Sequence, residues 1–285
     1  MNGLPKVSIG VPCFNGGIHL APALESALTQ DYANLEVVYV DDASTDGSLE
    51  VARSLAVRYP RLRVFENPKN LGLHGCWNRV LTLCDGDYVK LLCADDLIYP
   101  GAIARQVAIM ERNPTVMAVT SDSDVVDYLD RRVHLRRINL PKDRASDKQH
   151  VVEACIEAGT NVIGEPSIVL MRGSAVRAKT GFNADFKYVI DLDYVLSLLD
   201  EGDLWVESEV AAAFRMHPGS LTHQGLDKAE AELTRCFRLH RQGSFDEQAM
   251  HERIRRKRWM KSVFLSLIGN PVGRVLLRTA AKVAL

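Results

Sequence analysis

The chain has 285 residues, of which 47% are hydrophobic and a quarter are charged, and its 35 Lys and Arg residues nearly balance its 36 Asp and Glu residues. This composition is typical of a globular protein with a full core, and it excludes a disordered chain, a collagen-like repeat and a small disulfide scaffold. The six cysteines form no C-x-x-C pair, and neither a signal peptide nor a long apolar run is evident, so we expect a cytoplasmic protein.

The first 120 residues alternate between strand and helix patterns. The apolar run at 35–40 is continuous, which predicts a strand buried on both faces of a sheet. Strand–helix alternation is typical of βαβ units, so the sequence predicts an α/β fold with a mostly parallel central sheet flanked by helices. Further strands are expected at 7–11, 62–65, 88–93 and 116–120, and helices at 20–30, 46–59, 73–84 and 100–112.

The second half of the chain is less regular. The runs at 125–129 and 133–138 predict a hairpin, and the segment from residue 226 to the end reads as helices. Further helices are expected at 151–158 and 188–199, and strands at 167–171 and 204–214.

Two acidic pairs, Asp41-Asp42 and Asp95-Asp96, stand where predicted strands end. Ligands of an open parallel sheet bind at the carboxyl ends of its strands. A single Asp there is usually a turn or cap residue, but four converging carboxylates repel one another unless a cation neutralises them. Oxygen ligands favour Mg²⁺ or Mn²⁺. Because the sequence has no glycine-rich phosphate loop, it predicts a nucleotide-diphosphate substrate held by such an ion.

Four motifs together resemble the family 2 glycosyltransferases, in order and in spacing. They are VSIGVPCFNGG from Val7, VDDASTDG from Val40, N-x-G at Asn70–Gly72 and DGDYVKLLCADD at 85–96. The similarity covers roughly residues 5–225 and is strongest before residue 100. It implies a Rossmann-like GT-A domain over 1–225, with a nucleotide-binding half at about 1–120 and an acceptor half at 121–225. A helical extension would then follow over 226–285.

The resemblance implies roles for residues in the first half. Pro12, Phe14 and Asn15 match the segment that packs around the nucleobase, with Phe14 as the stacking ring. Asp42 matches the carboxylate that hydrogen-bonds the base, whereas Asp41 supports the turn or touches the ribose.

The pair at 95–96 matches the D-x-D-type motif of the family. The resemblance implies that Asp96 binds Mn²⁺ or Mg²⁺ and that Asp95 contacts the ribose or the ion. Cys93 stands where the family often has another Asp, which removes one ligand. Trp77 stands where many relatives carry Arg. It either stacks on the nucleotide or fills the core beneath it, and its place on a helix favours the core.

The acceptor half carries the residues expected to perform the chemistry. Asp191 matches the general base of the family, with Ile190 in place of the usual Glu, although spacing alone equally fits an ordinary polar helix face. Its apolar neighbours should raise the pKa of Asp191 and make it a better base. His217, in an R-x-H-x-x-S segment, would contact the diphosphate or the metal. Glu165 would bind an acceptor sugar, or is simply a loop carboxylate.

Basic charge is concentrated at the C-terminus, where residues 251–285 carry nine basic residues and one acidic residue. Arg274, Arg278 and Lys282 recur at four-residue intervals and share one helical face. Such a segment either binds an anionic membrane surface, where a lipid-linked acceptor would lie, or packs on the body with its basic side solvated. We expect no nucleic-acid partner, since no reading motif is evident.

These observations predict an inverting glycosyltransferase. It would move a sugar from a nucleotide-diphospho-sugar, expected to be a UDP-sugar, to a hydroxyl of a glycan or lipid-linked acceptor in bacterial surface polysaccharide synthesis. A sugar-phosphate nucleotidylyltransferase is one alternative, but its glycine-rich signature is missing. A non-catalytic nucleotide- or glycan-binding module is the other, and the presence of Asp191 and His217 argues against it.

Overall fold

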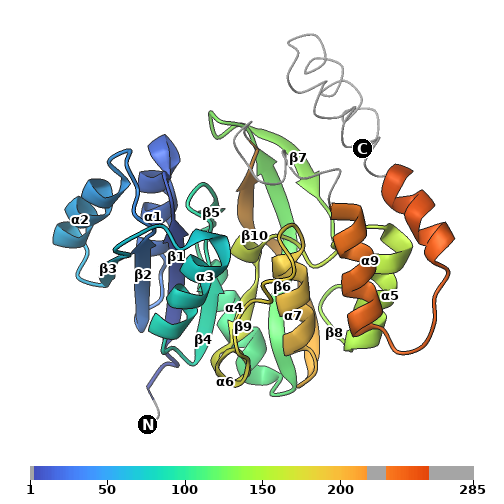
Figure 1. Ribbon diagram of the computed structural model, residues 1–285. Coiled ribbons are helices and arrows are strands. Elements are labelled where there is room, and N and C mark those ends of the chain that lie inside the picture. Colours follow the sequence, from blue (N-terminus) through green and yellow to red (C-terminus); the bar gives the residue numbers. More distant parts are fainter. Residues whose placement is uncertain (1–2, 217–228, 257–285) are drawn as a thin grey trace.

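The computed structural model describes residues 3–216 and 229–256, so His217 and most of the basic C-terminal segment lie outside the described part of the chain. One ten-stranded sheet runs through the molecule, with helices on both faces (Figure 1). Its strand order is β3-β2-β1-β4-β9-β6-β10-β5, with β7 beside β6 and β8 beside β10. The predicted α/β class with a helix-flanked central sheet is confirmed.

The first half of the sheet is entirely parallel. Its strands are β1 (Val7–Cys13), β2 (Leu35–Asp41), β3 (Leu62–Glu66) and β4 (Tyr88–Leu91). The intervening helices are η1 (Gly17–His19), α1 (Leu20–Leu28), α2 (Ser48–Arg58) and α3 (Gly72–Leu83). These elements agree with the predicted alternation to within a few residues.

The continuous apolar run in β2 is explained by helices on both faces. Val37 and Tyr39 pack in one core cluster with α1 and α2, whereas Val38 and Val40 pack in the other with α3. Successive residues of a strand point to opposite faces, so both sets are buried. The helix α3 lies so close to β1 that a Cβ on Gly10 would be 2.2 Å from Val80 Cγ1.

The second half of the sheet is mixed. The strand β9 is antiparallel to both β4 and β6, while β6 and β10 form a long parallel ladder. The strands are β5 (Leu97–Ile98), β6 (Val116–Val126), β7 (Arg132–Arg136), β8 (Ala145–Ser146), β9 (Leu170–Arg172) and β10 (Asp203–Arg215). The helices are α4 (Ala102–Arg112), α5 (Lys148–Ala158), η2 (Pro166–Ile168), α6 (Gly173–Ala178), α7 (Ile190–Leu198) and α9 (Ala229–His240). Residues 247–256 are also helical.

Two of the expected strands differ from the expectations, and β5, β8 and α6 were not expected. The predicted strand at 167–171 begins as the 3₁₀ turn η2, in which Pro166 takes the first position, where its fixed φ suits the start of a helical turn. The strand β6 continues past residue 120 through polar residues that are buried between β7 and β10. The predicted hairpin is confirmed as β6 and β7.

The register brings the loops after three strands to one edge of the sheet. Cys13 at the end of β1 pairs with Asp41 at the end of β2, and Gly10 pairs with Leu91 at the end of β4. The loops that follow residues 13, 41 and 91 therefore lie beside one another. Among the described residues, no helix is long and apolar enough to cross a bilayer.

Candidate active site

The loop after β1 is fastened to the loop after β2. Asn15 adopts a left-handed conformation (φ 54°), its Oδ1 accepts a hydrogen bond from Thr45 N at 2.8 Å, and its own N–H donates to Ser44 Oγ at 3.0 Å. Pro12 is buried within β1, whereas Phe14 is 54% exposed. This arrangement leaves an exposed aromatic ring at the carboxyl edge of the sheet, where a planar base can stack on it.

The two carboxylates after β2 are both buried but have different partners. Asp41 accepts hydrogen bonds from the Tyr39 hydroxyl at 2.8 Å and from Ser44 N at 2.7 Å, so it supports the turn. Asp42 Oδ1 accepts from Asn67 Nδ2 at 2.5 Å and Leu71 N at 2.9 Å, and its Oδ2 accepts from Gly72 N at 3.0 Å. A carboxylate oxygen can accept two hydrogen bonds, which leaves Asp42 Oδ2 with capacity for a ligand.

Asp95, Asp96 and the Cys93 thiol offer ligand atoms within 4.8 Å of one another. Burial, together with the charge of Asp95, raises the pKa of Asp96 well above its usual range. A nearby cation would favour both carboxylates in their charged form. Burial also raises the pKa of the Cys93 thiol, and a neutral thiol is a poor ligand for a hard ion. The donor set that fits Mg²⁺ or Mn²⁺ is therefore the two Asp side chains.

Two residues outside the predicted site, Ser167 and Arg215, hold this acidic pair in place. Ser167 Oγ donates to Asp96 Oδ2 at 2.6 Å, and Arg215 N donates to Asp96 Oδ1 at 2.9 Å. The fully buried Arg215 side chain also donates to the Asp95 carbonyl oxygen at 2.7 Å and pairs with Asp130 at 2.5 Å. No motif pointed to Ser167, whereas Arg215 opens the R-x-H-x-x-S segment that drew attention to His217.

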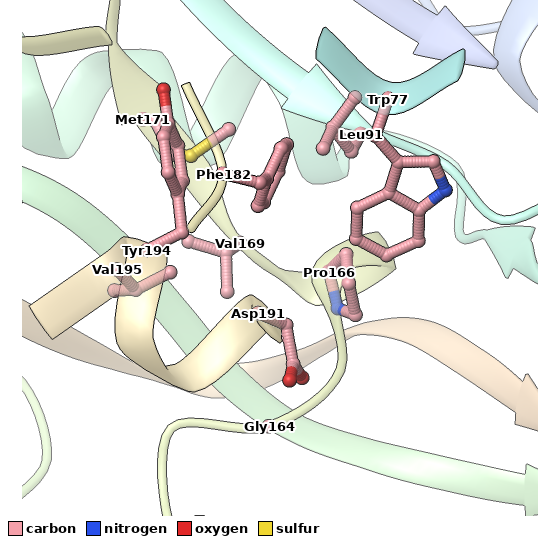
Figure 2. Close-up of a pocket in the computed structure, with 10 residues that line it drawn as sticks. All are labelled: Trp77, Leu91, Gly164, Pro166, Val169, Met171, Phe182, Asp191, Tyr194 and Val195. Carbon is pink, nitrogen blue, oxygen red and sulfur yellow. The ribbon is translucent and has the colours of Figure 1, made fainter. Parts of the chain in front are cut away.

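Asp191 lies in the first turn of α7 and lines a mostly apolar pocket with Trp77, Pro166 and Phe182, among other residues (Figure 2). Burial raises the pKa of Asp191 to about 6, and the charge of Glu165 acts in the same direction. Asn161 Nδ2 donates to Asp191 Oδ2 at 3.3 Å. The pKa shift has the direction expected from the apolar neighbours of Asp191 in the sequence.

Glu165 is joined to Asp191 through a short polar network. The Arg136 guanidinium forms an ion pair with Glu165 and donates to the Asn161 carbonyl oxygen at 2.7 Å. Asn161 in turn contacts Asp191, as described above. Glu165 is therefore part of the Asp191 neighbourhood rather than an isolated loop carboxylate, and its contact with an acceptor stays a prediction.

Trp77 packs against the core, as its place on a helix favoured, and its stacking on a nucleotide stays a prediction. Its ring packs edge-to-face on Phe182 with centroids 5.1 Å apart, and it belongs to the partly buried margin of the core. The same ring also faces the pocket that contains Asp191, with Pro166 between them in Figure 2.

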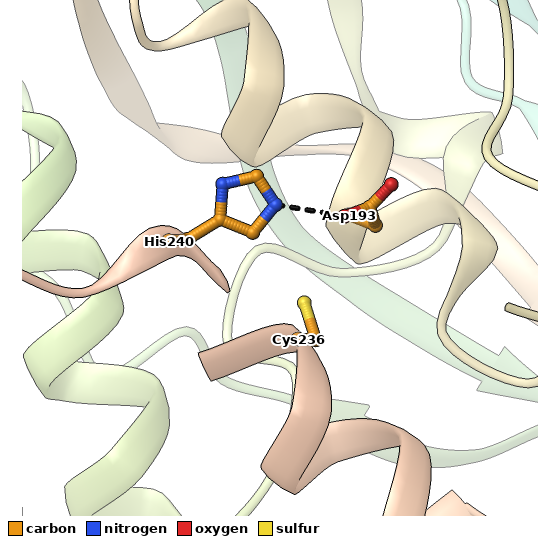
Figure 3. Close-up of side chains that lie close together, drawn as sticks. All are labelled: Asp193, Cys236 and His240. Carbon is orange, nitrogen blue, oxygen red and sulfur yellow. Dashed lines mark hydrogen bonds and ion pairs between the residues drawn. The ribbon is translucent and has the colours of Figure 1, made fainter. Parts of the chain in front are cut away.

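A second cluster lies between α7 and α9 and contains Asp193, Cys236 and His240, all buried (Figure 3). His240 Nε2 donates to Asp193 Oδ1 at 2.8 Å. Burial and the charge of Asp193 raise the pKa of the Cys236 thiol, which keeps it protonated. In this cluster the His240–Asp193 hydrogen bond joins α9 to α7.

The family model described as "Glycosyl transferase family 2" matches residues 8–168, which is more than half of the chain. The chain belongs to glycosyltransferase family 2. It is 30% identical over 208 residues to the putative glycosyltransferase EpsE of Bacillus subtilis, and the aligned region covers 71% of this chain and 69% of EpsE. It is 28% identical over 254 residues to the uncharacterized glycosyltransferase YibD of Escherichia coli, and the aligned region covers 86% of this chain and 67% of YibD. The family expected from the sequence motifs is confirmed.

Solved structures confirm the GT-A-type fold of this family 2 member. A Staphylococcus aureus TarS structure in complex with UDP-GlcNAc matches 87% of this chain and 70% of its own with a TM-score of 0.66 and 17% identity. The structure of the mannosyltransferase PcManGT of Pyrobaculum calidifontis, in complex with GDP-Man and Mn²⁺, matches 98% of this chain and 80% of its own. The TM-score is 0.62 and the sequence identity is 19%. At these identities the similarity concerns the fold alone.

Proposed function

We propose that this family 2 glycosyltransferase inverts the anomeric centre of a sugar as it moves it from a nucleotide-diphospho-sugar to a hydroxyl group. The single observation that supports the proposal is that Asp191, a carboxyl group of raised pKa, lines an apolar pocket and lies close enough to Cys93 to raise the pKa of its thiol, as Asp95 and Asp96 also do. UDP is the favoured nucleotide because the TarS structure with a similar fold holds UDP-GlcNAc. The GDP-Man complex of PcManGT makes GDP the second choice.

The acceptor is proposed to be a glycan or a lipid-linked sugar of a bacterial surface polysaccharide. A stretch of 100 residues is 37% identical to the chondroitin synthase of Escherichia coli, although it covers only 35% of this chain and 14% of that protein. The basic segment at 251–285 supports a site of action at an anionic membrane, where lipid-linked acceptors are held.

Asp191 would act as the general base. A sugar hydroxyl is a weak nucleophile, so a carboxylate within hydrogen-bond reach must take its proton as the new bond forms. The hydroxyl oxygen bonds to the anomeric carbon while the bond from that carbon to the diphosphate oxygen breaks on the opposite face. With a pKa of about 6, Asp191 is a stronger base than an ordinary Asp and is still ionised at neutral pH.

The nucleotide would occupy the carboxyl edge of the first half of the sheet. Phe14 would stack on the base, and Asp42 Oδ2 would accept a hydrogen bond from it. Asp95 and Asp96, with His217 from outside the described residues, would hold Mn²⁺ or Mg²⁺, which when bound offsets charge on the leaving diphosphate.

Calorimetric titration of UDP and GDP, with and without Mn²⁺, tests the donor site. Binding should tighten with Mn²⁺ in the wild-type protein and lose that dependence in Asp96→Ala. Asp85→Ala is the matched control, because Asp85 is an exposed carboxylate that precedes β4 and so lies at the opposite end of the strand. If neither nucleotide binds, the proposed donor site is wrong. If a nucleotide binds but no nucleotide-sugar is transferred or hydrolysed, the non-catalytic binding module becomes the better description.

A further inference from the structure

The helix α9 contacts the Asp191 helix and the segment that leads into it at three places. The first is Glu232, whose Oε2 accepts hydrogen bonds from Tyr188 N at 2.7 Å and from Lys187 N at 2.9 Å. These residues come just before α7, which begins at Ile190. One carboxylate therefore fixes two consecutive backbone amides close to the base.

The second contact is made one turn further along α9. The Arg235 guanidinium lies 4.7 Å from the ring centroid of Phe186 and donates to the Asp185 carbonyl oxygen. Phe186 itself is buried against the core. The segment 185–188 is thus held by the packing of Phe186 in the core and by the contacts of Glu232 and Arg235 on α9.

The third contact is the buried pair of His240 and Asp193, shown with Cys236 in Figure 3. Asp193 lies two residues after Asp191 in the first turns of α7. Glu232, Cys236 and His240 are spaced four residues apart, so they lie on one face of α9. That face is directed at α7 and at the segment before it.

The segment before α7 needs such support because the helix does not cap itself. Its N-cap residue is Val189, whose side chain makes no capping hydrogen bond. A helix start without a side-chain cap leaves amide groups to be satisfied from elsewhere, and it frays more easily. Glu232 does not replace this cap, because its two donor amides precede Val189, but it fixes the chain that enters the helix from an element more than 40 residues away.

We propose that Glu232 is a positioning residue, through which α9 fixes the segment before α7 and so the place of Asp191 in the site. The inference rests on the proposed role of Asp191 as the base. It assigns to α9 a part in catalysis, although the helix lies outside the residues matched by the family model. A misplaced base costs rate, because catalytic groups must be held within a fraction of an ångström.

Hydrogen–deuterium exchange on the full chain tests the contact without any donor or acceptor. In Glu232→Ala, the amides of 186–192 should exchange about tenfold faster than in the wild-type protein, since two hydrogen bonds to a charged group are lost. Glu232→Gln keeps an acceptor oxygen and should restore most of the protection. Arg238→Ala is the matched control, because Arg238 pairs with Glu247 at an exposed position of the same helix. Unchanged exchange in Glu232→Ala would overturn the proposal.

Release of UDP from UDP-GlcNAc and of GDP from GDP-mannose, each with Mn²⁺, supplies the catalytic readout. In Glu232→Ala, kcat should fall about tenfold while KM for the donor stays the same, and Glu232→Gln should recover most of the rate. Equal losses in kcat and in donor affinity would show a merely structural role and overturn the proposal. Asp191→Asn is measured in parallel. If that variant turns over normally, the proposed function fails, whereas an inactive Asp191→Asn beside a fully active Glu232→Ala refutes only the role of Glu232.

Discussion

Each acidic residue of the site owes its chemistry to its own surroundings. Asp41 and Asp42 are adjacent, yet the first is committed to its turn, whereas the second keeps acceptor capacity at Oδ2. Asp191 has its pKa raised chiefly by burial, and Asp193, two residues later, is paired with His240. Side chains of one type are therefore assigned different tasks by the hydrogen-bond donors and the solvent around them.

Replacing Asp191 tests its proposed role as the general base. We expect Asp191→Asn to lower kcat by about 10³-fold, because general-base catalysis contributes roughly that much. Nucleotide affinity should stay the same, since the proposed nucleotide contacts lie elsewhere. Asp185→Asn, an exposed Asp in the segment before α7, is the control. Steady-state turnover and calorimetry on both variants check this, and a parallel loss of turnover and nucleotide affinity would contradict the assignment.

The same residue gives a pH-dependent effect on stability. Burial raises the pKa of Asp191 from 3.8 to about 6, so the native state binds more protons than the unfolded chain between these values. The contribution of Asp191 to the free energy of unfolding therefore falls as pH rises through this window. Above pH about 6 Asp191 is ionised in both states, and the full destabilisation from its buried charge is present. Asp191→Asn should raise the free energy of unfolding at pH 7, by at most about 3 kcal/mol. Urea unfolding should show a clearly smaller gain at pH 4.5, and equal gains at both pH values would contradict it.

At the scale of elements, the sheet places the site and the helices fix it. The strand β2 is buried on both faces, and its register with β1 aligns the loops that carry Phe14 and Asp42. The predicted alternation of strands and helices is confirmed because apolar periodicity is a local property of the sequence. The length of β6 was missed because its polar residues are buried only when β7 and β10 lie beside it.

Packing between β2 and α3 gives a stability prediction. Val40→Ala should lower the free energy of unfolding by about 2 kcal/mol, because it removes two methyl groups from a fully buried position and leaves a cavity. Val57→Ala, at an 87% exposed position of α2, should change it by less than about 0.5 kcal/mol. Urea unfolding of the two variants checks the difference. A similar small effect in both would mean that the Val40 site closes around the cavity.

The whole molecule combines a body of acidic net charge with a basic C-terminal segment, since the chain as a whole has a net charge of −1. Only residues up to 256 of that segment are described, so its membrane role stays a prediction.

Replacing Arg274, Arg278 and Lys282 by Gln should weaken binding to phosphatidylglycerol vesicles about 100-fold, at about 1 kcal/mol per basic residue. Arg53→Gln with Arg58→Gln, on the exposed side of α2, is the control. Unchanged vesicle sedimentation in the triple variant would favour packing on the body.

The sequence by itself determined the fold class, the family and the residues that end the strands of the first half. Those features are written in local patterns: apolar periodicity, acidic pairs after strands, and motifs of fixed spacing. Asp191 was also found in this way, because its surrounding segment resembles that of the family.

Only the tertiary structure decided which residues hold these groups in place. Ser167 lies 71 residues after Asp96 in the chain and Arg215 lies 119 residues after it, yet both hydrogen-bond its carboxylate. Glu232 likewise hydrogen-bonds the backbone of the segment before α7 although it lies 44 and 45 residues after Tyr188 and Lys187 in the chain. Such partners are chosen by how the sheet and its helices pack, and a single sequence records the residue types but not which of them meet.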